Sequence, residues 1–164
     1  MKLLIIRHAD AGDPDAWTDA GRADSERPLS EKGRNQFTKA AKTLVELVPD
    51  IGLVAVSPYV RARQTAKLLL DLLPLSKEEI TESLVPEAEP EDFVRWLNKG
   101  RPSEVVAVVG HEPHLSLLAT WLIAGLDESR ITLKKGGACL ITFDKSAARG
   151  EGTLEWLLGR RQLK

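Results

Sequence analysis

Short runs of apolar residues, many of them β-branched, recur along the chain between longer stretches in which apolar and polar positions are mixed. Runs of this kind are typical of β-strands when polar or turn-forming residues bound them. They predict strands at residues 3–6, 51–56, 80–85, 105–109, 138–143 and 153–158.

Apolar residues at helical spacing occupy several of the segments between these strands. Ser30 can cap a helix that runs to about Val48, because apolar residues recur there three and four positions apart. Further helices are expected at residues 60–73, 90–99 and 113–124, and the last two open with a proline near the first turn. Strands that alternate with helices predict an α/β fold, a three-layer sandwich with helices on both faces of the sheet.

The last two predicted strands are joined differently, by polar residues 144–152 without helical spacing. They are therefore expected to pair as an antiparallel carboxy-terminal hairpin, which makes the mostly parallel sheet of about six strands a mixed one. The longest irregular polar stretch, residues 10–26, begins just after the first predicted strand. A loop of that length beside a strand end is either a lid or mobile.

Length and composition narrow the class of protein. At 164 residues the chain is expected to form one domain, residues 1–164. Its single cysteine, Cys139, cannot form an internal disulfide, and its place in an apolar run indicates an inert core thiol. The first apolar run is too short for a signal peptide, and no run reaches the roughly 18 residues of a membrane span. We therefore expect a soluble, cytoplasmic protein that does not act at a membrane.

The charge balance argues against nucleic acid as a partner. The net charge is −1 and aromatic residues make up 5% of the chain, so it has neither a global basic field nor a stacking surface. Any anion site must therefore be local.

Three of the predicted strands are followed by residues that carry positive charge or can transfer a proton. Arg7 and His8 follow the strand at 3–6, Arg61 lies in the segment after 51–56, and His111 follows 105–109. If these strands are neighbours, the guanidinium and imidazole groups converge at one edge of the sheet. Such a cluster suits a phosphoryl group, whose charged oxygens require forked, charge-assisted donors.

The remaining histidine, His114, lies one helical turn beyond His111 and is expected on the helix surface or at the rim of the site. Together with Glu112, these two histidines could suggest a metal site. Their spacing matches neither the two-histidine helix motif of zinc proteases nor a cysteine-containing structural site, so no metal is expected.

Four segments that contain these residues resemble motifs of the histidine phosphatase superfamily, and more closely its small phosphohistidine phosphatase branch. They are Arg7-His8, residues 27–33, residues 57–66 and residues 109–113. Ala9 stands where the family usually has glycine. The four segments occur in the family's order and span most of the chain.

The resemblance implies phosphoryl transfer without a metal or other cofactor. His8 would attack phosphorus through one ring nitrogen while a backbone carbonyl holds the other, and water would then hydrolyse the phosphohistidine. Arg7, Arg61 and His111, if His111 is protonated, would neutralise the phosphoryl oxygens. Arg27 would either contact phosphate or anchor its loop through a carboxylate.

One part of the family pattern is missing, namely the glutamate with which larger members protonate the leaving oxygen. Glu82, Glu87, Asp10 and Glu112 are all candidates for this acid, and the sequence does not choose among them. A phosphohistidine substrate leaves through a nitrogen that can be protonated beforehand, so it depends less on such an acid.

The connections between predicted elements are also too short for the helical cap of larger members, which suits a phosphorylated protein surface as substrate. The function expected from the sequence is therefore removal of phosphate from phosphohistidine on a signalling protein such as a histidine phosphotransfer domain. The alternatives are a phosphatase of small phosphorylated substrates in the same superfamily and a non-catalytic phosphate-binding module.

Overall fold

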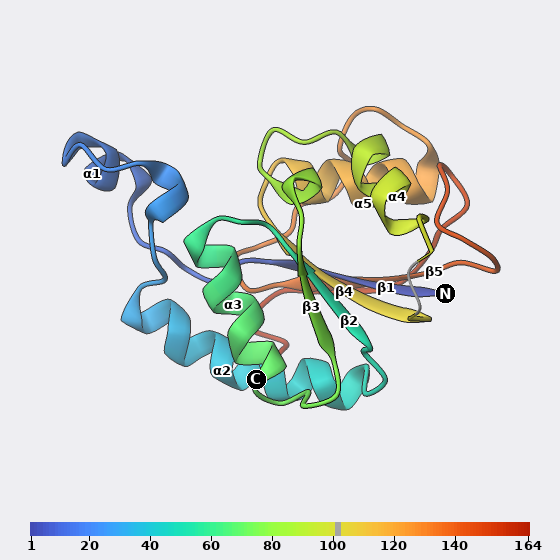
Figure 1. Ribbon diagram of the computed structural model, residues 1–164, viewed down its shortest axis with the longest axis horizontal. Coiled ribbons are helices and arrows are strands. Elements are labelled where there is room, and N and C mark those ends of the chain that lie inside the picture. Colours follow the sequence, from blue (N-terminus) through green and yellow to red (C-terminus); the bar gives the residue numbers. More distant parts are fainter. Residues whose placement is uncertain (101–102) are drawn as a thin grey trace.

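The computed structural model describes residues 1–100 and 103–164 and shows a six-stranded sheet between two layers of helices (Figure 1). The strands are β1 (Lys2–Arg7), β2 (Leu53–Val56), β3 (Lys77–Ile80), β4 (Val105–Gly110), β5 (Ala138–Thr142) and β6 (Thr153–Leu158). The α-helices are α1 (Pro14–Asp19), α2 (Glu31–Leu47), α3 (Val60–Leu70), α4 (Pro90–Leu97) and α5 (His114–Ala124), and short 3-10 helices are η1 (Asp24–Glu26) and η2 (Glu82–Leu84).

The order of strands in the sheet is β3-β2-β4-β1-β5-β6. The first four are parallel, β5 runs antiparallel to β1, and β6 runs antiparallel to β5. This arrangement confirms the predicted mixed sheet and its antiparallel carboxy-terminal hairpin. It also makes β2, β4 and β1 neighbours, so that the loops after all three strands meet at one edge.

Alternate side chains of the strands enter two separate cores. Leu4 and Ile6 of β1 pack under α2 and α3, whereas Leu3 and Ile5 pack under α4 and α5 (Figure 1). Burial on both faces explains why these strands read as continuous apolar runs. Cys139 lies in the second core, and burial raises the pKa of its thiol to about 12, as expected for an inert core residue.

The strand predicted at residues 80–85 is wrong. The strand at this edge of the sheet is β3, which contains Lys77, Glu78 and Glu79 and therefore shows no apolar run. Edge strands commonly carry charge because it discourages pairing with other chains. The apolar residues that prompted the prediction instead form η2, where Leu84 is fully buried against the second core.

Residues 10–26 are more ordered than expected from their composition. Asp13 caps α1 by accepting a hydrogen bond from the Asp15 amide, and none of the six residues of α1 is buried. This helix projects away from the sheet (Figure 1), while the following η1 returns and packs against α3. The loop thus reaches back to the sheet edge at which β1, β2 and β4 end.

None of the described helices is long and apolar enough to cross a bilayer.

Candidate active site

The carboxyl ends of β1, β2 and β4 hold the loops that carry the predicted site residues. The His8 amide donates to the Gly110 carbonyl at 3.0 Å, and the Ser57 amide donates to the Val109 carbonyl at 3.1 Å. These bonds continue the sheet ladder by one residue beyond each strand. His8, Ser57 and His111 therefore leave a rigid edge, which limits how far their side chains can move.

His8 is held in one orientation by its own loop. Its Nδ1 lies 2.7 Å from the carbonyl oxygen of Ala9, which can only accept, so Nδ1 carries the proton and Nε2 carries the lone pair. The Ala9 amide in turn donates to Thr65 Oγ1 at 3.1 Å, and that hydroxyl donates to the Arg61 carbonyl at 2.8 Å. Thr65 thus ties the loop after β1 to the helix that carries Arg61.

The environment of His8 keeps its imidazole neutral. Burial and the positive charges of Arg61, Arg7 and Arg27 lower its pKa to about 3, against the opposing hydrogen bond to Ala9. At neutral pH the lone pair on Nε2 is therefore not blocked by a proton. A neutral imidazole with a fixed tautomer is the form required of a nucleophile.

Arg61 lies directly against this nucleophile. Its Nε donates to His8 Nε2 at 3.3 Å, and its guanidinium is almost completely buried. The two terminal nitrogens bind Asp24, with Nη1 2.7 Å from its carbonyl oxygen and Nη2 2.9 Å from its carboxylate. A forked cation at this distance from the nucleophile is suited to hold the oxygens of a phosphoryl group.

Arg27 reaches the same carboxylate from the other side. Its Nε donates to Asp24 at 2.8 Å, and its Nη1 donates to the Ala11 carbonyl at 2.9 Å. Of the two roles considered for Arg27, the structure shows the anchoring one, and its charge also acts on His8 and His111. The Asp24 side chain is half-exposed. A phosphate group from solution can therefore reach the guanidinium groups of Arg27 and Arg61 and compete with the Asp24 carboxylate for them.

His111 completes the cluster. Its ring centroid lies 5.0 Å from that of His8, and its Nε2 lies 2.8 Å from Ser57 Oγ. Burial, together with the nearby His8 and Arg61, lowers its pKa to about 2. A lowered pKa favours the neutral form of His111 at neutral pH, whereas the role expected from the sequence uses its protonated form.

Arg7 lies beside this cluster with its guanidinium held by a distant loop. Its Nη1 donates to the Leu133 carbonyl at 2.8 Å, and its Nε has no hydrogen-bond partner within the described part of the chain. The Leu133 amide donates to Ser116 Oγ, whose hydroxyl donates to the carboxylate of Glu112. The loop before β5 is thus tied to the amino-terminal end of α5.

The structure separates the four candidates for the leaving-group acid. Asp10 bonds Lys135 and Ser30, which lower its pKa to about 2, so its carboxyl group carries no proton to donate. Glu112 accepts from both the amide and the hydroxyl of Ser116 and so caps α5. Glu82 and Glu87 are exposed and act electrostatically on Tyr59, whose ring centroid lies 4.9 Å from that of His111.

The sequence analysis missed Asp24, the carboxylate that contacts both Arg61 and Arg27. No motif marks it, because its partner Arg61 lies 37 residues away in the chain. Burial raises the pKa of Asp24, but its bonds to Arg27 and the charge of Arg61 outweigh this and lower it overall.

The expected placement of His114 is wrong. It is 1% exposed at the first turn of α5, and burial lowers its pKa to about 4. Seven other residues of α5 are buried as well, so most of this helix faces the core rather than solvent. Among residues 1–100 and 103–164, no group of three or more His, Cys, Asp or Glu side chains is placed to hold a metal ion.

Comparison with known proteins agrees with this geometry. Residues 3–85 match the family described as histidine phosphatase superfamily (branch 1). The chain belongs to the histidine phosphatase superfamily. The phosphohistidine phosphatase SixA of Escherichia coli (strain K12) is 31% identical, with 100% of this chain and 97% of that protein covered. An uncharacterized protein of Picosynechococcus sp. is 30% identical, covering 91% of this chain and 88% of its own length.

A solved structure, described as the protein histidine phosphatase SixA complexed with tungstate, superimposes with a TM-score of 0.82 at 29% identity. The superposition covers 100% of both chains. Family membership and these relatives indicate that this member of the superfamily is a phosphatase.

Proposed function

We propose that this phosphatase removes the phosphoryl group from phosphohistidine on a protein, without a metal, through a phosphohistidine intermediate on His8. The observation that carries the proposal is the state of His8. Its Nδ1 proton is held by the Ala9 carbonyl, its Nε2 lone pair is free of a proton at neutral pH, and Arg61 Nε lies 3.3 Å from that atom.

The first step exchanges one phosphorus–nitrogen bond for another. A bond forms between His8 Nε2 and phosphorus while the bond from phosphorus to the substrate's imidazole breaks. Arg61 stabilises the oxygens in the transition state, with Arg7 and the partnerless Nδ1 of His111 completing the ligand set. In the second step water forms a bond to phosphorus, the His8–phosphorus bond breaks, and inorganic phosphate leaves.

The leaving group explains why a dedicated acid is unnecessary. An imidazole nitrogen can be protonated before its bond to phosphorus breaks, whereas an alkoxide must receive its proton during the step. Asp10 is ionised, and the Glu112 carboxylate is held by two hydrogen bonds from Ser116 although burial raises its pKa, so Asp10 holds no proton to donate and Glu112 is held by Ser116. The readily protonated leaving nitrogen and the engagement of these two carboxyl groups both favour a phosphoramidate substrate over a phosphate ester.

The relatives support the same substrate class. The full-length match is named as a phosphohistidine phosphatase, and the superimposed structure contains tungstate, a tetrahedral oxyanion like phosphate. We accordingly infer that residues 1–164 form one catalytic domain that acts in the cytoplasm on a phosphotransfer protein of a signalling system.

Covalent labelling tests the chemistry. Wild-type protein incubated with ³²P-labelled phosphohistidine protein and quenched in base should carry an acid-labile label. His8→Ala should carry none, whereas Arg63→Ala, an exposed arginine two residues from Arg61, should be labelled normally. A label that persists in His8→Ala would exclude His8 as the nucleophile.

Turnover of different substrates tests the specificity. The protein should hydrolyse a phosphohistidine protein faster than a panel of sugar phosphates and other small esters. Clear preference for a small ester would overturn the protein substrate. Phosphate binding without label or turnover would instead indicate a non-catalytic binding module.

A further inference from the structure

A basic cavity of about 650 Å³ lies beside the candidate active site. It is lined by residues on both sides of His8, namely Arg7, Ala9 and Asp10, so it opens next to the nucleophile. Its volume is typical of ligand-binding pockets in proteins. Nothing in the phosphoryl-transfer chemistry uses it apart from Arg7.

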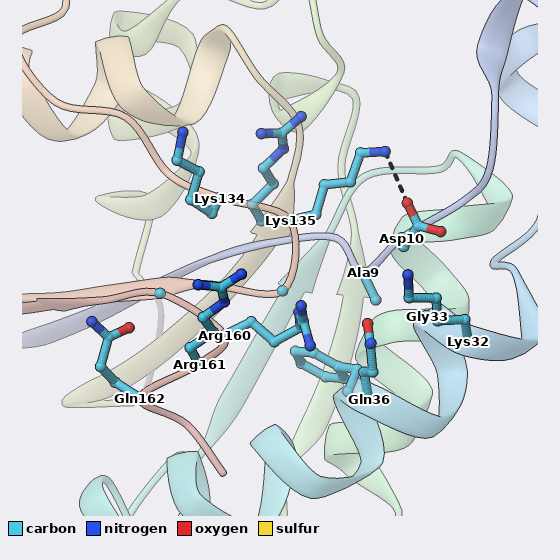
Figure 2. A pocket seen from close by; sticks show the side chains of 14 residues that line it. Ala9, Asp10, Lys32, Gly33, Gln36, Lys134, Lys135, Arg160, Arg161 and Gln162 are labelled. Atoms are coloured by element: carbon cyan, nitrogen blue, oxygen red, sulfur yellow. Dashed lines mark hydrogen bonds and ion pairs between the residues drawn. The ribbon is translucent and has the colours of Figure 1, made fainter.

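Cationic side chains dominate its lining, although the chain as a whole has a net charge of −1. Lys134 and Lys135 come from the segment before β5, Arg160 and Arg161 from the tail after β6, and Lys32 from the first turn of α2 (Figure 2). Among the residues that the structure describes, these five and Arg7 place six cations around the cavity, against the single carboxylate of Asp10. These side chains come from separate segments of the sequence, so they lie together only in the folded protein.

Most of these charges are unneutralised. Within the described ranges, the side chains of Lys32, Lys134, Arg160 and Arg161 form no hydrogen bond or ion pair. Lysines and arginines scattered over a surface are ordinarily solvated and need no partner, but here they line one concave space. Their combined field therefore attracts negative charge to this position.

The cavity already binds one carboxylate, which indicates the kind of group it accepts. Lys135 Nζ lies 2.9 Å from Asp10 Oδ1, and both residues line the cavity (Figure 2). The remaining cations are arranged to bind further carboxylates supplied from outside. A small monophosphate without a second anionic group would be neutralised by Arg61 and its neighbours and would leave the cavity's cations without a partner.

We propose that this basic cavity binds an acidic segment of the protein substrate next to its phosphohistidine. The inference rests on the proposed function, because it concerns how the phosphoprotein is recognised. The cavity would act as a docking site that lowers KM for substrates with aspartate or glutamate near the phosphorylated histidine. The rest of the surface, being net acidic, would repel the same segment and so direct it to this face.

Matched peptides test this inference separately from the chemistry. Two phosphohistidine peptides of equal length are compared, one with four glutamates flanking the histidine and one with four glutamines, together with free phosphohistidine. The wild type should show a KM about tenfold lower for the glutamate peptide, with similar kcat for both, because several partly exposed ion pairs add modestly. Added salt should remove this preference.

The variant Lys134→Glu/Arg160→Glu/Arg161→Glu should lose the preference for the glutamate peptide and hydrolyse free phosphohistidine as the wild type does. A control with the same change in charge is Lys42→Glu/Lys77→Glu/Lys145→Glu, three exposed lysines that do not line the cavity, and it should keep the preference. If the triple variant fails to fold, Lys134→Gln/Arg161→Gln provides the same comparison with less repulsion.

The outcomes separate the two proposals. Equal KM for the two peptides in the wild type, or the same loss of preference in the control, would overturn the docking site while leaving the phosphatase activity intact. Inhibition of all three substrates by pyrophosphate that is lost in Lys134→Glu/Arg160→Glu/Arg161→Glu would show that the cavity takes a compact polyanion instead, which also overturns the docking site. Failure to hydrolyse free phosphohistidine and both peptides would overturn the proposed function itself.

Discussion

At the scale of single residues, Asp24 has the largest consequence for phosphate binding. Its carboxylate accepts hydrogen bonds from Arg61 and Arg27, so it occupies part of the cationic site that a phosphoryl group would need. A substrate must therefore displace an internal anion before it can bind to both guanidiniums. The half-exposed position of Asp24 on the loop that returns from α1 makes this displacement feasible without unfolding the site.

Replacing Asp24 with asparagine should strengthen phosphate binding. The variant keeps the shape of the side chain and the bond from Arg61 to the backbone carbonyl of residue 24, but it removes the competing charge. We expect the inhibition constant of inorganic phosphate to fall about fivefold, which corresponds to about 1 kcal/mol, a typical value for a partly exposed ion pair. Steady-state inhibition measurements give this constant directly.

Glu26→Gln is the matched control, because Glu26 lies in the same short helix, is exposed, and has no contact with Arg61. It should leave phosphate inhibition unchanged. Weaker binding of phosphate to Asp24→Asn would mean that Asp24 serves mainly to position the arginines rather than to compete for them.

The residues of the site differ in how far the sequence alone could predict them. His8 and His111 could be found because each follows an apolar strand directly and lies in a recognisable motif. Asp24 could not, because it lies in a polar loop and meets Arg61 only after the chain has folded. The burial of His114 was likewise not predicted, because α5 is apolar on most of its faces and its sequence therefore does not mark a solvent side.

At the scale of elements, the central strands were predictable and the edge strand β3 was not. β1 and β4 are buried on both faces, so their sequences are almost purely apolar, and the predicted ranges are shorter than the observed ones by one residue at each end of β1 and one at the end of β4. β3 pairs with β2 through its backbone alone and carries charged side chains. Main-chain pairing of this kind leaves no hydrophobic pattern to detect.

The start of α2 is the element boundary on which the loop beside His8 depends. Ser30 caps the helix by accepting from the Gly33 amide at 2.9 Å, and its own amide donates to the Asp10 carbonyl at 2.9 Å. A Cβ atom at residue 33 would overlap that same carbonyl. Glycine is therefore required here for close approach of the helix to the loop, since no side chain fits between them.

Gly33→Ala should destabilise the protein and impair catalysis together. Overpacking against a backbone that cannot move freely costs about 1–3 kcal/mol, and the displaced Asp10 lies two residues from His8. We expect a lower midpoint in urea unfolding and a reduced kcat with phosphohistidine. Lys39→Ala, an exposed substitution in the same helix, should change neither. A wild-type kcat in Gly33→Ala would show that the loop can adjust without moving His8.

At the scale of the whole molecule, three buried histidines make stability depend on pH. Burial lowers the pKa of His8 to about 3, of His111 to about 2 and of His114 to about 4. In the unfolded chain the same groups titrate near 6.5. Between these values the unfolded chain binds more protons than the folded one, so protonation favours unfolding.

The free energy of unfolding should therefore be highest above pH 6.5 and fall as the pH is lowered towards the folded-state values. Each histidine contributes at most about 1.4 kcal/mol per pH unit, and the three together contribute at most roughly 4 kcal/mol per pH unit, a steep dependence for a domain whose total stability is about 5–15 kcal/mol. The folded-state pKa of Asp10 is about 2 and its ordinary value is near 3.8. Its protonation therefore lowers the free energy of unfolding only below about pH 3.8. Urea unfolding at pH 7.5, 6.0 and 5.0 measures mainly the histidine part, which the raised pKa of the buried Glu112 carboxyl opposes as the pH falls.

His114→Leu isolates one of these contributions without touching the cluster around His8. The side chain is 1% exposed, and neither ring nitrogen has a geometric hydrogen-bond partner in the part of the chain that the structure describes, although the nearby Glu89 backbone acts to raise its pKa, so leucine removes the proton site at a modest cost in polar contacts. The slope of the unfolding free energy between pH 6.0 and 5.0 should flatten by about a third. An unchanged slope would mean that His114 is already protonated in the folded protein, and that its burial is compensated by a negative group rather than by loss of its proton.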